Sequence, residues 1–522
     1  MKILVLSLLR VGDLIQQKPL LARLREKHPG AEIHLLVNRS VLSVRDLFPE
    51  VDLWFSFDRD GLQKQLGSAE IPILKPLSEL STLVEELSYE HYDLVYNFTH
   101  NRLSAFLASA IPAVEKKGLL AQGTGFRTFE NSWLRHFNER FGTKEGTPFH
   151  YIELLAGAFD LGQIEPPRLA VRGDLLLIQP LTSDVKKNYH PTSWNRCLAQ
   201  VRAEHPDLEI KILGAPFEKE TLLKSFDEED LLICEWSELR GVLQRAALLV
   251  TGDTSVKHLA VHAGVPILEI ALGSADPEKT GAYADGAWVL TTAIACAPCP
   301  HHRPCRQLSH LCGEQLRPED VASVIDALLN GREPSVVSET TRLAKTKFVP
   351  GIGWSLSSGD DIASFEKAAW SLFLDGGDYP PVGSASRHWR QSITTESFER
   401  NLPILSSSQN ELATQFRAQV QQLQELALLC FAENMNSVRV EEIRRSFTDV
   451  LPMSPLLRSY FSDIRETLSR PFPSPMHFFG ALKKRFEELG RRLEIRNKMI
   501  HQMEESNGRI LGKETRRSPE PT

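Results

Sequence analysis

The chain has 522 residues, of which 42% are hydrophobic and 24% charged, and its formal net charge is −7. This length predicts about three domains of roughly 150 residues each. The negative charge argues against a global basic surface for nucleic acid. The sequence holds no run of about 20 apolar residues, so any membrane contact is expected to be peripheral.

Residues 1–165 alternate between β-prone and helical segments. An apolar run at 2–8, a helical spacing over 14–27 and a second apolar run at 33–37 predict a βαβ unit. Further strands are expected at 53–57 and 94–97, with helices over 78–88, 103–110 and 151–161. This alternation predicts a parallel sheet with helices on both faces.

The same alternation restarts at residue 175 and defines a second α/β domain over 166–335. Strands are expected at 175–179, 210–213, 231–234 and 248–251, with helices over 192–203 and 237–246. The chain therefore contains two α/β domains in tandem, each with a parallel sheet.

The character of the sequence changes after residue 335. Residues 336–390 read as a connector with some order, and 374–387 are rich in Gly, Pro and Ser. Residues 391–508 contain two stretches of amphipathic helical spacing, which predict a helical extension. A small helical bundle is one interpretation, and self-association or a partner helix is the other. Residues 509–522 are expected to be disordered.

Residues 249–268 hold the strongest local pattern: a buried strand, a tight turn at Gly252, and a helix. Asp253, Thr254 or Ser255 can cap this helix, and free N–H groups at its start can bind a phosphate. His258 falls in the first helical turn. An ordinary capped helix with a structural histidine is the alternative interpretation.

Two further loops follow strands at the ligand-binding edge of an open α/β sheet. Thr182, Ser183, Lys186 and Lys187 follow the strand at 175–179, so hydroxyls and ammonium groups can meet a phosphate there. Asp13 follows the first strand of the chain. Its carboxylate can act as a general base or simply cap the following helix.

Four segments carry a resemblance to a known family. Residues 10–13 (RVGD) and 251–260 (TGDTSVKHLA), with 92–97 (YDLVYN) and 272–274 (LGS), are similar to motifs of the lipopolysaccharide heptosyltransferases, glycosyltransferase family 9. Ser255 stands where that family mostly has glycine. The resemblance covers about residues 1–330, and nothing after 335 resembles the family core.

The resemblance implies an α/β GT-B fold, with two Rossmann-like domains facing a cleft and a C-terminal, mostly helical region added. It implies an inverting glycosyltransferase that moves a heptose from ADP-heptose, or another nucleotide sugar, to a hydroxyl acceptor such as lipopolysaccharide core. No cofactor is expected to be required. The enzyme is expected in the cytoplasm, with peripheral contact to the inner membrane face.

The resemblance also implies roles for particular residues. Asp13 becomes the catalytic base, and the donor-binding set becomes Thr182, Ser183, Lys186, Lys187, Glu218, Asp253, Thr254, Ser255 and His258. The family has one lysine before a Trp-Pro pair, which reads His190-Pro191 here, so the choice between the two lysines stays open. Cations for a phosphorylated acceptor are expected at Arg10, Lys18, Arg59, Lys64 and Arg102.

A cysteine cluster, Cys296, Cys299, Cys305 and Cys312, has His301, His302 and His310 interleaved. This spacing is compatible with a metal knuckle, although a structural loop without metal is the preferred interpretation.

Two other functions stay open. The fold can serve a different nucleotide sugar or a protein acceptor. It can also be a non-catalytic scaffold that works through its helical tail.

Overall fold

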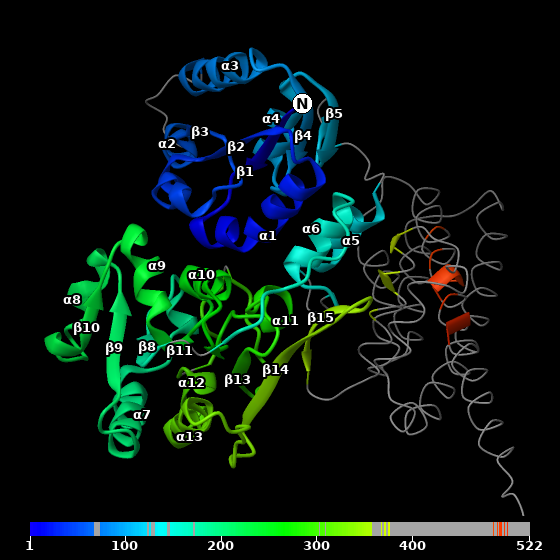
Figure 1. Ribbon diagram of the computed structural model, residues 1–522. Coiled ribbons are helices and arrows are strands. Elements are labelled where there is room, and N and C mark those ends of the chain that lie inside the picture. Colours follow the sequence, from blue (N-terminus) through cyan, green and yellow to red (C-terminus); the bar gives the residue numbers. More distant parts are fainter. Residues whose placement is uncertain are drawn as a thin grey trace, which may run out of the picture. The chain divides into compact units, whose positions relative to one another are not determined.

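The computed structural model describes residues 1–66, 74–122, 125–126, 131–142, 147–170, 173–301, 303–307, 309–357 and single positions between 367 and 499. The chain divides into two compact units, and the first contains both sheets (Figure 1).

The first sheet is built from the N-terminal part of the chain. Its strand order is β3-β2-β1-β4-β5, and all neighbours pair in parallel. The strands are β1 (Lys2–Ser7), β2 (Glu32–Asn38), β3 (Leu53–Phe57), β4 (Tyr92–Asn97) and β5 (Ala113–Gly118). The inner strands β1 and β2 are almost wholly buried, as continuous apolar runs in parallel sheets usually are.

Helices cover both faces of this sheet. Leu83 and Leu87 of α3 and Leu107 of α4 pack with Leu4 and Leu6 of β1. Helix α1 lies on the opposite side in Figure 1. The helices are α1 (Val11–Lys27), η1 (Arg39–Leu47), α2 (Arg59–Leu66), α3 (Leu74–Ser88), α4 (Arg102–Ala110), α5 (Ser132–Arg140) and α6 (Tyr151–Ala158), and β6 (Ala121–Gln122) pairs with β7 (Gly125–Phe126).

The second sheet has the order β10-β9-β8-β11-β12-β13-β14-β15. Pairing is parallel from β10 to β13, and β14 then runs antiparallel to β13. The strands are β8 (Leu175–Gln179), β9 (Glu209–Gly214), β10 (Leu231–Ile233), β11 (Ala246–Thr251), β12 (Ile267–Ile270), β13 (Trp288–Thr292), β14 (Thr341–Val349) and β15 (Gly353–Ser357).

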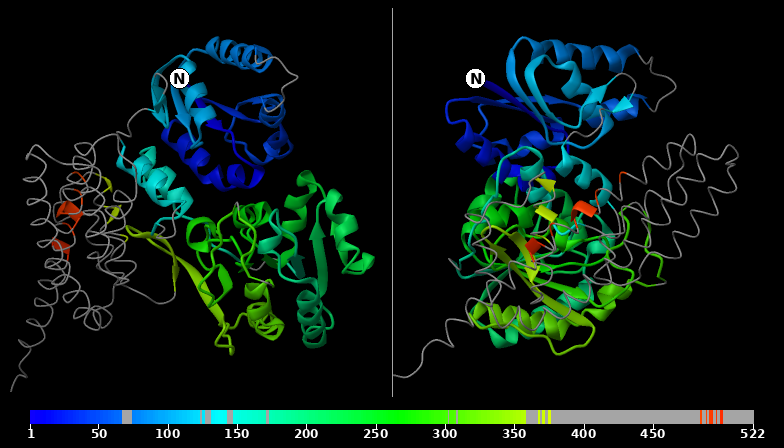
Figure 2. Two further views of the ribbon diagram at one scale, coloured as in Figure 1. Left: turned by 180° about the vertical axis from the view of Figure 1, so that it is seen from behind. Right: turned by 90° about the vertical axis from the view of Figure 1, so that its right-hand side faces the viewer.

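The core of this half lies between the sheet and two long helices. Trp194 and Val201 of α7 and Val321 and Ile325 of α13 pack against buried residues of β8, β9 and β11. Helices α9 and α10 lie on the other side of the sheet, as Figures 1 and 2 show. The helices are η2 (Val185–Lys187), α7 (Pro191–Glu204), η3 (Pro216–Glu218), α8 (Lys219–Leu222), η4 (Glu228–Asp230), α9 (Trp236–Gln244), α10 (Ser255–Ala263), α11 (Pro277–Thr280), α12 (Leu311–Gln315) and α13 (Pro318–Leu329).

Residues 341–357 differ from the sequence prediction, which placed them in a connector. They form β14 and β15, the last two strands of the second sheet. The prediction missed β14 because Arg342, Lys345 and Lys347 interrupt its apolar residues. Charged side chains of this kind are common on strands near a sheet edge.

Few residues of the second unit are described. Trp370 is buried there, with the Arg492 guanidinium 3.4 Å and the Arg140 guanidinium 5.4 Å from its ring centroid. The predicted helical extension over 391–508 lies outside the described residues, except for isolated helical positions between 484 and 499. The tail over 509–522 lies wholly outside them.

Candidate active site

The turn between β11 and α10 is fixed by two threonine hydroxyls. Thr251 Oγ1 and Thr254 Oγ1 donate to Gln179 Oε1 at the end of β8, over 2.9 and 2.7 Å. Thr254 is the N-cap of α10, and its Oγ1 accepts from Lys257 N–H at 3.3 Å. The first N–H groups of α10 therefore start at a rigid corner at the end of two central strands.

Asp253 lies in this turn between two lysines. Its Oδ1 is 2.9 Å from Lys257 Nζ, and its Oδ2 is 3.1 Å from Lys187 Nζ. Burial acts to raise the pKa of Asp253, but the charges of Lys257 and Lys187 outweigh it and hold the pKa well below its usual range. Asp253 is therefore ionised at neutral pH.

Lys257 and Glu269 form a buried ion pair behind the turn that the sequence did not single out. Lys257 Nζ donates to Glu269 Oε1 at 2.7 Å and to Thr280 O at 3.0 Å. Burial favours the neutral amine, but Asp253 and Glu269 outweigh it and raise the pKa of Lys257. The sequence did contain a signal for this pair, because Lys257 and Glu269 each interrupt an otherwise apolar segment.

The two candidate lysines of the 182–187 loop point to different partners. Lys187 is almost fully buried, and its Nζ also donates to Asp253 O at 3.1 Å. Lys186 Nζ donates to the carbonyl oxygens of Pro300, His301 and Arg303 at 3.0, 3.1 and 2.7 Å. Only Lys187 therefore contacts the turn at Asp253.

The other two members of this loop have different surroundings. Thr182 Oγ1 lies 2.8 Å from both Asp184 O and Asn188 Oδ1, which share its single O–H donor, so the hydroxyl stabilises the loop. Ser183 is exposed. Gly273 approaches the same loop so closely that an added Cβ would lie 2.0 Å from Lys186 O.

Asp13 lies near the turn, although it belongs to the first α/β domain. Its Oδ2 accepts from Arg10 N–H at 3.2 Å, but Arg10 is the N-cap of α1 and Asp13 lies in the first turn, so Asp13 is not the N-cap itself. Burial raises the pKa of Asp13; Arg10 and Lys187 act to lower it, and Asp253 adds to the increase. The carboxyl group therefore lies within electrostatic reach of Asp253 and Lys187.

Helices α1 and α10 bring these groups together. A Cβ added to Gly12 would lie 3.0 Å from Ser255 Oγ, and His262 Nε2 is 2.9 Å from Ile15 O. Figure 1 shows the two helices side by side. The start of α1, which carries Asp13, thus lies against the start of α10.

On α10, His258 is buried and His262 is partly buried at this junction. Burial, and then the charge of Lys257, hold the pKa of His258 far below its usual value. Burial also lowers the pKa of His262 to about 4. Both rings are therefore neutral at pH 7, and they can accept or donate hydrogen bonds without adding charge.

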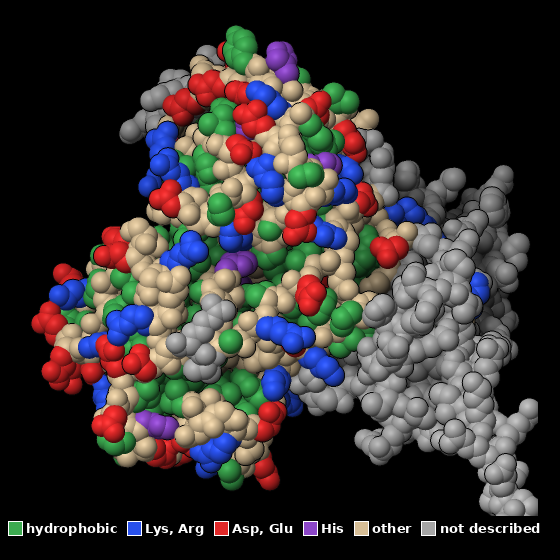
Figure 3. Space-filling model, viewed as in Figure 1, with side chains coloured by type: hydrophobic (Ala, Val, Ile, Leu, Met, Phe, Trp, Pro, Cys, Tyr) green, Lys and Arg blue, Asp and Glu red, His purple; other side chains and the backbone are tan. Residues whose placement is uncertain are grey.

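Glu218 has a local capping contact, because its Oε2 accepts from Ala215 N–H at 2.8 Å. Among the predicted acceptor cations, Lys18 pairs with Glu50 at 2.6 Å, and Arg59 donates to Leu8 O at 2.6 Å and pairs with Asp60. Arg10, Lys64 and Arg102 are exposed. On the face shown in Figure 3, Lys and Arg side chains are interspersed with Asp and Glu.

The cysteine cluster lies in the loop that Lys186 holds. Cys299 N–H donates to Gly273 O at 2.7 Å, and His310 Nε2 is 2.7 Å from Lys186 O. Burial acts against ionisation of Cys312, but the hydrogen bond and charge of His310, together with backbone N–H groups of Gly273 and Gly313, outweigh it and lower the pKa of this thiol. Among the residues that the structure describes, the group whose metal-type ligand atoms all lie within 4.8 Å of one another is Glu204, His205 and Asp326.

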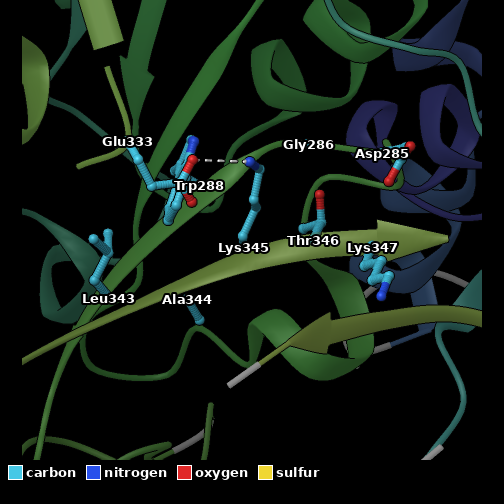
Figure 4. Close-up of a pocket in the computed structure, with 9 residues that line it drawn as sticks. All are labelled: Asp285, Gly286, Trp288, Glu333, Leu343, Ala344, Lys345, Thr346 and Lys347. Carbon is cyan, nitrogen blue, oxygen red and sulfur yellow. Dashed lines mark ion pairs between the residues drawn. The ribbon is translucent and has the colours of Figure 1, made fainter. Parts of the chain in front are cut away.

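A separate cavity of about 620 Å³ opens on β13 and β14 (Figure 4). Lys345 Nζ lies 4.7 Å from the Trp288 ring centroid and 3.5 Å from Glu333 Oε2. None of the predicted site residues lines this cavity.

The two mainly parallel sheets, with a turn of the phosphate-binding type after a central strand, agree with the expected GT-B fold. Residues 161–309 match the model of glycosyltransferase family 9 (heptosyltransferase). Comparison with curated proteins gives no match.

Solved structures similar to this chain include three glycosyltransferases. The family 9 glycosyl transferase of Veillonella parvula DSM 2008 shares 19% identity over 63% of this chain and 97% of its own, with a TM-score of 0.46. E. coli heptosyltransferase WaaC with ADP-2-deoxy-2-fluoro heptose shares 16% identity over 62% of this chain and 99% of its own, with a TM-score of 0.45. E. coli ADP-heptose lps heptosyltransferase II shares 17% identity over 63% of this chain and 99% of its own, with a TM-score of 0.46.

Within the described part of the chain, none of the helices combines the length and the apolar character needed to span a bilayer.

Proposed function

We propose that the protein transfers a sugar from a nucleotide-diphosphate donor to a hydroxyl acceptor with inversion at the anomeric carbon. The supporting observation is that Asp13, Lys187 and the start of α10 converge, although they come from both sheets. ADP-heptose is the first donor to test, because family 9 is described by its heptosyltransferases.

In this reaction Asp13 accepts the proton of the acceptor hydroxyl, and the hydroxyl oxygen attacks the anomeric carbon. The bond from that carbon to the diphosphate oxygen breaks, and the diphosphate leaves with the electron pair. Lys187 and the free N–H groups of α10 stabilise its charge, so no metal is required. The raised pKa of Asp13 makes its carboxylate a better base than an exposed aspartate.

The remaining predicted residues support the two substrates. Thr182, Ser183, Lys186, Thr254, Ser255 and His258 would surround the diphosphate and sugar, and Glu218 would bind the nucleotide ribose. Arg10, Lys18, Arg59, Lys64 and Arg102 would lie on the acceptor side. A phosphorylated glycolipid such as lipopolysaccharide core is the proposed acceptor, and the site of action is the cytoplasmic face of the inner membrane.

Donor titration tests this proposal. The purified chain is titrated with ADP-heptose, UDP-glucose and GDP-mannose by calorimetry, and products formed with a lipopolysaccharide core acceptor are identified by mass spectrometry. We expect binding and transfer with ADP-heptose. If the protein binds a different nucleotide sugar, that sugar replaces ADP-heptose as the proposed donor. If it binds none of them, the proposed function is refuted.

A further inference from the structure

Lys257 contacts protein groups with all of its N–H donors. Its Nζ lies 2.9 Å from Asp253 Oδ1, 2.7 Å from Glu269 Oε1 and 3.0 Å from Thr280 O. An ammonium group has three N–H bonds, so these contacts use them all. The side chain is 0% exposed, and Lys257 therefore cannot reach a bound donor directly.

Lys187 holds the same carboxylate from the opposite side. Its Nζ donates to Asp253 Oδ2 and to Asp253 O, both at 3.1 Å, which leaves one N–H bond for another partner. Lys187 comes from the loop after β8, whereas Lys257 lies on α10 behind the turn. The two lysines thus divide the two oxygens of Asp253 between them.

The balance of positive and negative charges explains why pairing Asp253 with two lysines matters for donor binding. The ion pairs set two carboxyl groups, Asp253 and Glu269, against two ammonium groups, Lys187 and Lys257. A diphosphate at the turn that takes more than the one remaining N–H bond of Lys187 would compete with Asp253 for this lysine. Removing the partner of a buried charge is costly, so Asp253 can release Lys187 only if another cation stays with it.

We propose that Lys257 is the permanent counter-ion of Asp253 and thereby frees Lys187 to bind the donor diphosphate. Lys257 is then a positioning residue, and Glu269 keeps it charged and in place. The inference rests on the proposed function, because it requires a diphosphate at this turn.

The test compares the effect of Lys187→Met on ADP binding in two backgrounds, wild type and K257M/E269Q. The paired change removes one buried positive and one buried negative charge, so the net charge is kept. In the wild-type background, we expect Lys187→Met to weaken ADP binding by about 10- to 100-fold, as for a hydrogen bond to a charged group. In the K257M/E269Q background, Lys187 stays with Asp253, and the same change should cost less than about threefold.

The outcomes separate this inference from the function itself. If wild type binds ADP and Lys187→Met has the same effect in both backgrounds, Lys257 is merely structural and the inference is overturned. If wild type binds none of ADP, UDP and GDP, both the function and the inference fail; if it binds UDP or GDP instead, the same comparison is made with that diphosphate. Lys219→Met, at an exposed ion pair with Glu228, is the matched control and should leave ADP binding unchanged. Should K257M/E269Q fail to fold, K257Q/E269Q, which also keeps the net charge and retains hydrogen-bonding side chains, gives the same comparison.

Discussion

Replacing Asp13 by asparagine should separate catalysis from stability. Asparagine keeps the size of the side chain, and its Oδ1 can still accept from Arg10 N–H, now 3.2 Å from the carboxylate. Only the charge and the basicity are lost. General base catalysis typically contributes about 10²- to 10⁴-fold, so kcat should fall by that factor, or about 3–5 kcal/mol of activation free energy.

The stability of this variant should change in the opposite direction. The pKa of Asp13 is raised in the folded protein, so its ionised form at pH 7 is less favourable than in the unfolded chain. Asp13→Asn should therefore unfold at the same temperature as wild type or higher. Asp13→Ala loses the contact with Arg10 as well and should be less stable by about 0.5–1.5 kcal/mol.

Three measurements test this reasoning. Single-turnover product formation gives the loss in rate, ADP calorimetry shows that donor binding is retained, and calorimetric unfolding gives the stability. In wild type, kcat should fall as the pH decreases through the raised pKa of Asp13, at a higher pH than for an exposed carboxylate. Asp46→Asn, whose side chain is 88% exposed, is the control. An Asp13→Asn enzyme with more than a tenth of the wild-type rate would refute the assigned role.

Gly273→Ala should destabilise the protein by at least about 1–2 kcal/mol in urea unfolding, because φ is +61° there and the new Cβ would lie 2.0 Å from a backbone oxygen. Gly30→Ala, which has no neighbour within 4 Å, should cost less than 1 kcal/mol, and equal effects would contradict the strain argument. Glu269→Ala should cost about 3 kcal/mol in the same assay, since it removes a buried partner of Lys257, and a neutral effect would show that the pair is dispensable. Because the pKa of Asp253 is depressed by folding, its contribution to stability should be present above pH 4 and decrease as the pH falls below about 3.9; Asp253→Asn should flatten this part of the stability curve against pH.

The sheets were predictable because their inner strands are long apolar runs, and parallel strands buried on both faces produce that pattern. The predicted strands at 53–57 and 175–179 coincide with β3 and β8, and the others agree within two residues. No strand was predicted at β5, β13 or β15, and β14 was missed because alternating charged residues near a sheet edge do not produce an apolar run.

The sequence predicted which loops and turns form the site, but not which of their side chains contact one another. Thr254 was proposed among three possible caps, and the structure selects it as the N-cap of α10. The sequence left Lys186 and Lys187 equivalent, because adjacent residues in a loop have no periodicity that fixes their direction. Lys257 and Glu269 were missed because their pairing joins α10 to β12, and that contact depends on packing between elements.

The hydrogen bonds from Lys186 to the cysteine-containing loop should restrict how the length of this loop varies in evolution. Surface loops ordinarily accept added or deleted residues, because their ends alone are constrained. Here the Lys186 side chain holds carbonyl groups on residues 300, 301 and 303, while His310 contacts the Lys186 backbone in return. A one-residue insertion or deletion between 296 and 312 would move those carbonyl groups away from the Lys186 ammonium group. We therefore expect the length of this segment to be constrained, because it supports the loop that carries Lys186.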